Sequence, residues 1–215
     1  MGVSADHPGV NELFSLLAYG EVAAFYRLTD EARMAPDLRG RINMARMAAA
    51  EMRHYEMLRT TLESRGVDVL SSMTRYAPAL ENYHRLTLPS TWLEALVKTY
   101  VGDAMAADLY LAIAGSLPDE VADVVRAVLA ETGHSQFVVA DVRAAVTSSG
   151  RQRSRLALWS RRLLGEAITQ AQYVMADHDE LVDLVLSSGG LGQITDFFER
   201  MQQTHDARMR ELGIV

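Results

Sequence analysis

The feature that most constrains the fold of this chain is a Glu-x-x-His motif that occurs twice, at Glu51–His54 and at Glu131–His134. Residues three apart on an α-helix share a face, so each motif presents a carboxylate and an imidazole to one point. A single motif of this kind usually lies on a solvated helix face. Two such motifs in similar surroundings favour a metal site inside a bundle of helices.

The remaining sequence has a helical pattern almost throughout. Apolar residues recur at intervals of three and four, and Gly66, Pro36 and Pro118 interrupt the pattern. Ser90 or Thr91 is suited to cap one of the helices. The pattern predicts an all-α fold with helices at about 8–33, 37–65, 91–115, 119–146, 152–186 and 191–212, the last two separated by Ser187–Gly190.

The lengths of the connections predict the topology. Short links make two antiparallel hairpins, one from the first two helices and one from the next two. The connection over residues 67–89 is long, with a short helix around Leu80 to His84, and it allows a crossover before the second hairpin. We therefore expect a four-helix bundle with a long crossover between its second and third helices, followed by two additional helices.

Composition limits the class of protein. With 215 residues the chain can form one domain, residues 1–215, with a bundle over about 8–149 and a helical extension over about 151–215. The chain has no Cys, which excludes disulfides and thiolate ligands, and its net charge of −7 opposes general binding to nucleic acid or anionic lipid. No signal peptide or membrane span is apparent in the sequence, so a cytoplasmic location is expected.

Each motif has an acid at the same level on the preceding helix. In an antiparallel hairpin, residues equally distant from the turn lie side by side. Glu21 stands thirteen residues before the first turn at 34–37, and Glu51 stands fourteen residues after it. These two carboxylates are therefore expected to meet.

The same reasoning selects an acid in the second hairpin. Glu131 lies thirteen residues after the turn at 115–118, and its level partner is Asp103, which follows Gly102. Asp108 is displaced by about 7.5 Å along the axis and about 140° around it, so it is a weak reserve. Glu94 lies nine residues away in the other direction.

Four carboxylates buried together would repel one another, and two divalent cations would balance their charge. Glu51 and Glu131 are suited to bridge the two ions, with Glu21 and Asp103 as terminal ligands. Mixed oxygen and nitrogen ligation favours two iron ions, or manganese, over zinc. The predicted metal ligands are Glu21, Glu51, His54, Asp103, Glu131 and His134.

These residues resemble the ferritin-like di-iron carboxylate superfamily, in which two helices each give an acid and two others each give Glu-x-x-His. The string from Gly102 to Tyr110 and the two extra C-terminal helices are similar to its tRNA-hydroxylase (MiaE-like) branch. That resemblance implies a monooxygenase that uses O2 and an electron donor or reductase. The implied substrate is the isopentenyl group of a modified adenosine, as in a tRNA 2-methylthio-isopentenyladenosine hydroxylase.

The chain departs from the superfamily pattern in two ways. Asp103 stands where most members have Glu, and Ala50 and Ala130 stand where an Asp often orients a ligand His. Some other group must then hold the imidazoles.

An arginine cluster opens the predicted fifth helix: Arg151, Arg153, Arg155, Arg161 and Arg162. It could bind tRNA, but a solvated helix face or a subunit contact, as in a homodimer, explains it as well. Two other functions stay open for the chain. One is an iron-oxidising or peroxide-consuming protein without a tRNA role, and the other is a metal-free helical interaction protein.

Overall fold

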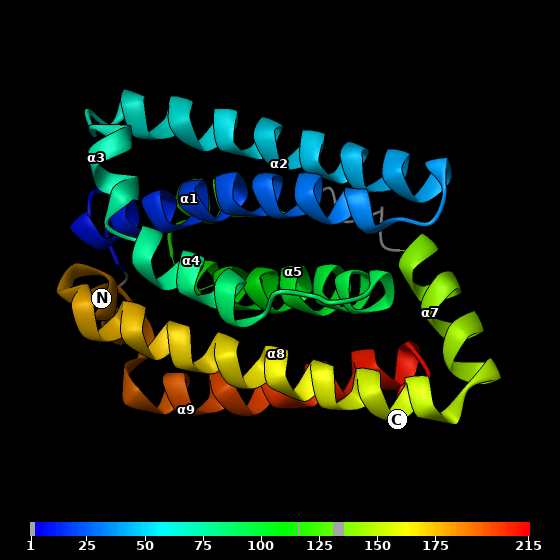
Figure 1. Ribbon diagram of the computed structural model, residues 1–215. Coiled ribbons are helices and arrows are strands. Elements are labelled where there is room, and N and C mark those ends of the chain that lie inside the picture. Colours follow the sequence, from blue (N-terminus) through cyan, green and yellow to red (C-terminus); the bar gives the residue numbers. More distant parts are fainter. Residues whose placement is uncertain (1–2, 116, 131–135) are drawn as a thin grey trace.

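A computed structural model describes residues 3–115, 117–130 and 136–215, with the backbone alone for residues 188–197. All regular secondary structure in these ranges is helical, which confirms the predicted class (Figure 1). The helices are α1 Pro8–Glu31, η1 Ala32–Met34, α2 Leu38–Ser64, α3 Val69–Thr74, α4 Ala77–Leu86, α5 Trp92–Ala114, α6 Asp119–Val128, α7 Gln136–Ser148, α8 Gly150–Asp177 and α9 Asp179–Glu211.

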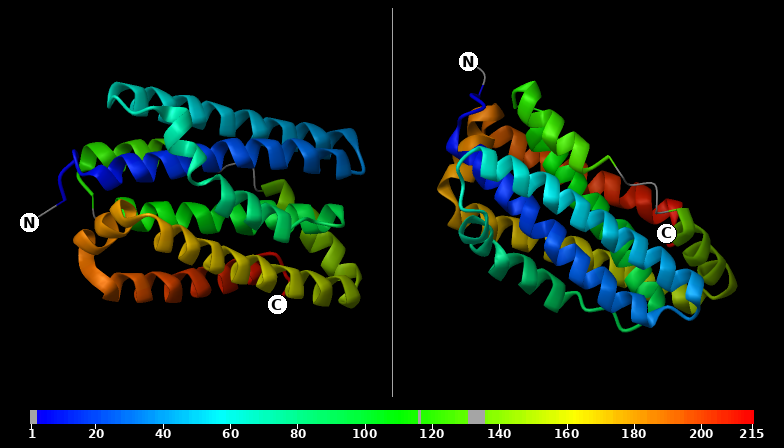
Figure 2. Two further views of the ribbon diagram at one scale, coloured as in Figure 1. Left: turned by 60° about the vertical axis from the view of Figure 1, so that its left-hand side comes forward. Right: turned by 90° about the horizontal axis from the view of Figure 1, so that it is seen from above.

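The topology is the one expected from the connection lengths. Helices α1 and α2 form an antiparallel hairpin, and α3 and α4 carry the chain back along it, so that α5 runs parallel to α2 (Figures 1 and 2). The crossover is therefore present. It contains two helices instead of the one short helix predicted around Leu80 to His84.

Local capping explains several helix ends. The Asp37 side chain accepts a hydrogen bond from the backbone N–H of Gly40 and so caps α2. After α2, Gly66 has a φ of 74°, a left-handed conformation that glycine adopts without strain. Of the two candidates for the α5 cap, Thr91 accepts the bond from the N–H of Glu94.

The prediction of one continuous helix over 119–146 is wrong. Helix α6 ends at Val128, and Leu129 forms its C-cap before α7 begins at Gln136. The backbone N–H of Leu129 bonds to the carbonyl oxygens of Val125 and Ala127, which is how a last helical turn tightens.

The predicted break at Ser187–Gly190 is also wrong, because α9 continues through these residues. The break lies earlier, at His178, whose φ of −133° and ψ of 85° are not helical. The buried His178 ring stacks on Tyr76 at 4.2 Å between ring centroids. The packing of the His178 side chain thus coincides with the junction of α8 and α9. The serines and glycines at 187–190 had predicted that junction later in the chain.

Helix α5 is shared by two hydrophobic clusters. Its C-terminal part, with Tyr110 and Ala114, packs with α1 and α6, while its N-terminal part, with Leu96 and Val101, packs with α7, α8 and α9. Helices α8 and α9 lie on the side of α5 away from α2 (Figure 1). Within the described residues, no helix has the length and apolar character needed to cross a membrane.

Candidate metal centre

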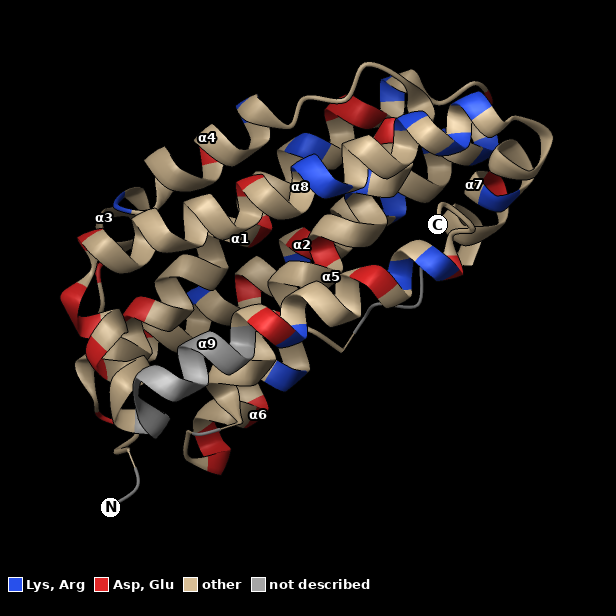
Figure 3. Cartoon of the chain, turned by 90° about the horizontal axis from the view of Figure 1, so that it is seen from below, with Lys and Arg blue, Asp and Glu red and all other residues tan. Residues whose placement is uncertain are grey.

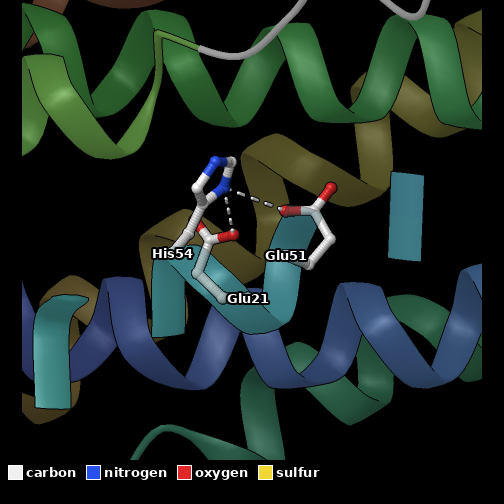
Figure 4. A group of neighbouring side chains, drawn as sticks. All are labelled: Glu21, Glu51 and His54. Carbon is white, nitrogen blue, oxygen red and sulfur yellow. Dashed lines mark hydrogen bonds and ion pairs between the residues drawn. The ribbon is translucent and has the colours of Figure 1, made fainter. Parts of the chain in front are cut away.

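Three of the predicted ligands meet inside the first hairpin. Glu21 comes from α1, and Glu51 and His54 come from successive turns of α2. His54 Nδ1 lies 3.2 Å from Glu21 Oε2 and 3.5 Å from Glu51 Oε2 (Figure 4). One ligand atom from each residue lies within 4.8 Å of the other two, so this metal cluster, Glu21–Glu51–His54, could hold a metal ion.

Burial and mutual hydrogen bonding shift the protonation of the metal cluster. Burial raises the pKa of Glu21 well above its usual value. Burial also acts to raise the pKa of Glu51, but hydrogen bonds with His54 and Glu21 and the charge of Arg27 outweigh it and lower that pKa. Hydrogen bonds to Glu21 and Glu51 raise the pKa of His54 to about 9.

The donor set therefore suits one divalent cation. Metal binding requires ionised carboxylates and a neutral imidazole, so an incoming ion must displace the proton on His54 and any proton that burial favours on Glu21. Two carboxylates and a neutral imidazole then carry two negative charges, which a divalent ion balances. Carboxylate and imidazole ligands suit iron and manganese.

His54 has one nitrogen aimed at the carboxylates and one without a partner. Nδ1 faces Glu21 and Glu51, whereas Nε2 is buried with no hydrogen-bond acceptor among the described residues. Ligand histidines usually donate their second nitrogen to an oxygen. The absent partner agrees with the sequence, which has Ala50 where an acid often performs this task.

Asp103 does not join the metal cluster. Its Oδ1 accepts a hydrogen bond of 2.7 Å from Arg27 Nη2, and its Oδ2 is buried without a hydrogen-bond partner in the described part of the chain. Burial raises the pKa of Asp103 to about 7, against the lowering effect of Arg27. The reserve candidate Asp108 lies elsewhere, in a bidentate pair with Arg208 at 2.7 and 2.9 Å.

The buried Arg27 side chain is the centre of a second cluster, which the sequence did not predict. Its guanidinium also donates to Glu31 Oε2 at 3.0 Å and to Thr99 Oγ1 at 2.9 Å. Lys98 Nζ lies 3.6 Å from Glu31 Oε1 and donates to the Thr87 carbonyl. We call this group the arginine network: Arg27, Glu31, Lys98, Thr99 and Asp103.

Two sequence signals pointed to the arginine network. Arg27 falls on the apolar stripe of α1, three residues after Ala24 and beside Leu28, where an unpaired charge would be costly. Lys98 is the only lysine in the chain, and it is 2% exposed. A lone buried lysine implies a nearby carboxylate.

The second Glu-x-x-His motif lies outside the described residues. Both Glu131 and His134 fall in the range 131–135, so the structure brings together three of the six predicted ligands and places the fourth, Asp103, in the arginine network.

A cavity of about 380 Å3 adjoins both buried clusters. Metal-cluster residues and Asp103 contribute to its wall, which is otherwise mainly apolar, with residues such as Leu16, Leu80, Met105 and Val174. Its volume lies near the lower end of the range for small-molecule pockets. Besides His54 Nε2 and Asp103 Oδ2, three buried polar atoms on lining residues have no hydrogen-bond partner among the described residues: Tyr83 Oη, His84 Nδ1 and Gln170 Nε2.

Comparison with known families agrees with this architecture. Residues 6–188 match a family described as "Ferritin-like domain, actinomycetes". The chain belongs to this family. The ferritin-like assignment supports the superfamily resemblance seen in the sequence and is compatible with metal binding, but it does not single out the tRNA-hydroxylase branch. No curated protein matches the chain.

Three members of the arginine cluster on α8 make contacts within the fold. Arg155 donates to Glu94 Oε1 at 2.8 Å, Arg153 donates to the Val146 carbonyl, and Arg162 donates to the Leu86 carbonyl. These bonds tie α8 to α5, to α7 and to the end of α4. Much of the cluster therefore has a structural explanation.

Proposed function

We propose that this ferritin-like protein is a non-haem iron oxidoreductase that uses O2 to hydroxylate or otherwise oxidise an apolar group held beside the metal cluster. The observation that carries the proposal is the position of Glu21, Glu51 and His54 on the wall of a largely apolar cavity. A ferritin-like fold also occurs in proteins that are not enzymes. The cavity is therefore the feature that favours an enzyme, because it offers a place for a substrate beside the metal cluster.

The residues of the chain have separate tasks in this proposal. Glu21 and Glu51 bind the metal through carboxylate oxygens, and His54 binds it through Nδ1 after losing its proton. Bound iron would supply the reductive activation of O2, with electrons from an external donor. The apolar wall excludes water and positions the group to be oxidised. The two-iron form predicted from the sequence would add Glu131 and His134 as ligands, together with Asp103, which hydrogen-bonds to Arg27 in the structure.

Anaerobic loading with Fe2+ followed by exposure to O2 tests the proposal. We expect iron bound at the metal cluster to be oxidised at a rate that Glu51→Gln reduces by more than about 100-fold. A chain that binds no iron would be a metal-free interaction protein instead. Light scattering separates the storage alternative, because iron storage needs a large cage and a monomer or dimer would exclude it.

A tRNA substrate is the second candidate, supported by the distribution of charge. Basic residues gather toward the end of the molecule that carries α7, although the chain is acidic overall (Figure 3). Arg151 and Arg161 are exposed on α8. We expect the double variant Arg151→Ala/Arg161→Ala to weaken tRNA binding and to flatten its salt dependence. Affinity that is absent, or insensitive to salt, would leave a small apolar molecule as the substrate.

A further inference from the structure

Asp103 is paired with a cationic side chain of the protein, the guanidinium of Arg27. The Arg27 side chain is 5% exposed, and its guanidinium contacts three oxygens, those of Asp103, Glu31 and Thr99. Thr99 and Asp103 lie one turn apart on α5, so Arg27 spans from α1 to two successive turns of the facing helix. An arginine stays charged at every pH at which the protein is folded, so Arg27 always presents a cation to Asp103.

The charges of the two clusters balance separately. In the arginine network, two cations, Arg27 and Lys98, face two carboxylates, Glu31 and Asp103. In the metal cluster, the two carboxylates of Glu21 and Glu51 face a single imidazole, that of His54. Among the described residues, the carboxylates without a guanidinium or ammonium partner in these two groups are therefore those of the metal cluster, and Asp103 is not one of them.

The position of Arg27 opposes a further ion near Asp103. Arg27 lies six residues after Glu21 on α1, about 9 Å along the helix axis. Its guanidinium is held there by hydrogen bonds to Asp103, Glu31 and Thr99. A divalent ion bound to both Glu51 and Asp103 would meet a positive charge that is already hydrogen-bonded there.

We propose that Arg27 is a positioning residue that holds Asp103 out of the ligand set, so that the two predicted metal positions are unequal. The metal cluster binds its ion with high affinity. The second metal position, for which the sequence predicted Asp103 as a ligand, binds its ion weakly while Arg27 is present. This inference rests on the proposed metal site and adds the order in which its positions fill.

Mn2+ titration of the metal-free full chain, followed by electron paramagnetic resonance of the free ion, measures this difference without relying on activity. We expect the native chain to bind about one ion tightly, with any second ion bound at least about tenfold more weakly. Asp103→Asn should leave the tight ion in place. Arg27→Met, which releases Asp103, should tighten the second ion by about tenfold or more, a gain that loss of fold cannot produce.

Glu31→Gln is the matched control, because it removes another carboxylate partner of Arg27 but leaves the bond from Arg27 to Asp103. We expect its Mn2+ binding to equal that of the native chain. Two equally tight ions in the native chain, one of them lost in Asp103→Asn, would overturn the inference while leaving the proposed function intact. Asp103→Asn is close in shape to the native residue, so this test holds even if Arg27→Met does not fold. A native chain that binds no Mn2+ and no Fe2+ would contradict the proposed function itself.

Discussion

The metal cluster and the arginine network are both groups of buried charge that contain two carboxylates, yet they differ in what balances them. Glu21 and Glu51 share a single imidazole, whereas Glu31 and Asp103 face a guanidinium and an ammonium. Buried carboxylates need compensation of one kind or the other. The difference teaches that spacing along a helix is not enough to identify a ligand. A carboxylate at the expected position can bind a metal only where no cationic side chain is already paired with it.

The largest expected effect is on stability, from the arginine network. Arg27→Met would leave the buried Glu31 and the partly exposed Asp103 beside a single cation, Lys98. Removing one partner of a buried ion pair typically costs about 3–5 kcal/mol of the free energy of unfolding. Urea unfolding of the metal-free chain would measure the loss. A change below about 1 kcal/mol would show that the network does not hold α1 against α5.

The next largest effect is the stabilisation of the protein by bound metal, which should depend on the metal cluster and not on the arginine network. Mn2+ at a hundred times its dissociation constant should raise the free energy of unfolding of the native chain by about 2.7 kcal/mol. Glu21→Gln should abolish this gain, because Glu21 belongs to the metal cluster. Asp103→Asn, the same carboxylate-to-amide change in the arginine network, should retain it. If both variants lost the stabilisation by Mn2+ equally, the two clusters would have to be parts of one metal site.

The smallest effect concerns pH and the arginine network. Burial lowers the pKa of Lys98 to about 8, from an ordinary value of 10.5. Its charged or titratable neighbours are Arg27 and Glu31 from α1, Tyr83 and His84 from α4, and Asp103 from α5. Between these two pKa values the unfolded chain binds more protons than the folded one, so this contribution to stability rises with pH.

Lys98→Met should remove that dependence. We expect the native chain to gain on the order of 1 kcal/mol relative to the variant as the pH rises from about 8 to about 10. Urea unfolding of both proteins at matched pH values would show it. Parallel curves for the two proteins would mean that Lys98 remains charged throughout.

The hairpin geometry could be predicted from the sequence, but the hydrogen-bond partner of Asp103 could not. Helical spacing and distance from a turn are local quantities, so the level pairing of Glu21 and Glu51 could be predicted from the position of Pro36 alone. The pairing of Asp103 depends on where Arg27 points, and α2 and the two crossover helices separate these residues in the sequence. No periodicity encodes that contact, although the charge on an apolar stripe signals that Arg27 needs a partner.

The helix ends show the same contrast. Gly66 ends α2 through its own backbone freedom, and that end was predicted. The junction of α8 and α9 depends on His178 packing against Tyr76, about one hundred residues earlier in the chain, so it could not be read from the glycines and serines nearby.

The most direct test of the central claim, that Glu21, Glu51 and His54 form a metal site, is the iron content of the purified chain after anaerobic loading and desalting. The native chain and Glu31→Gln should each retain at least about one iron per chain, while Glu51→Gln should retain less than about one tenth of that amount. Iron content that is the same in Glu51→Gln as in the native chain, or absent from both, would contradict the account.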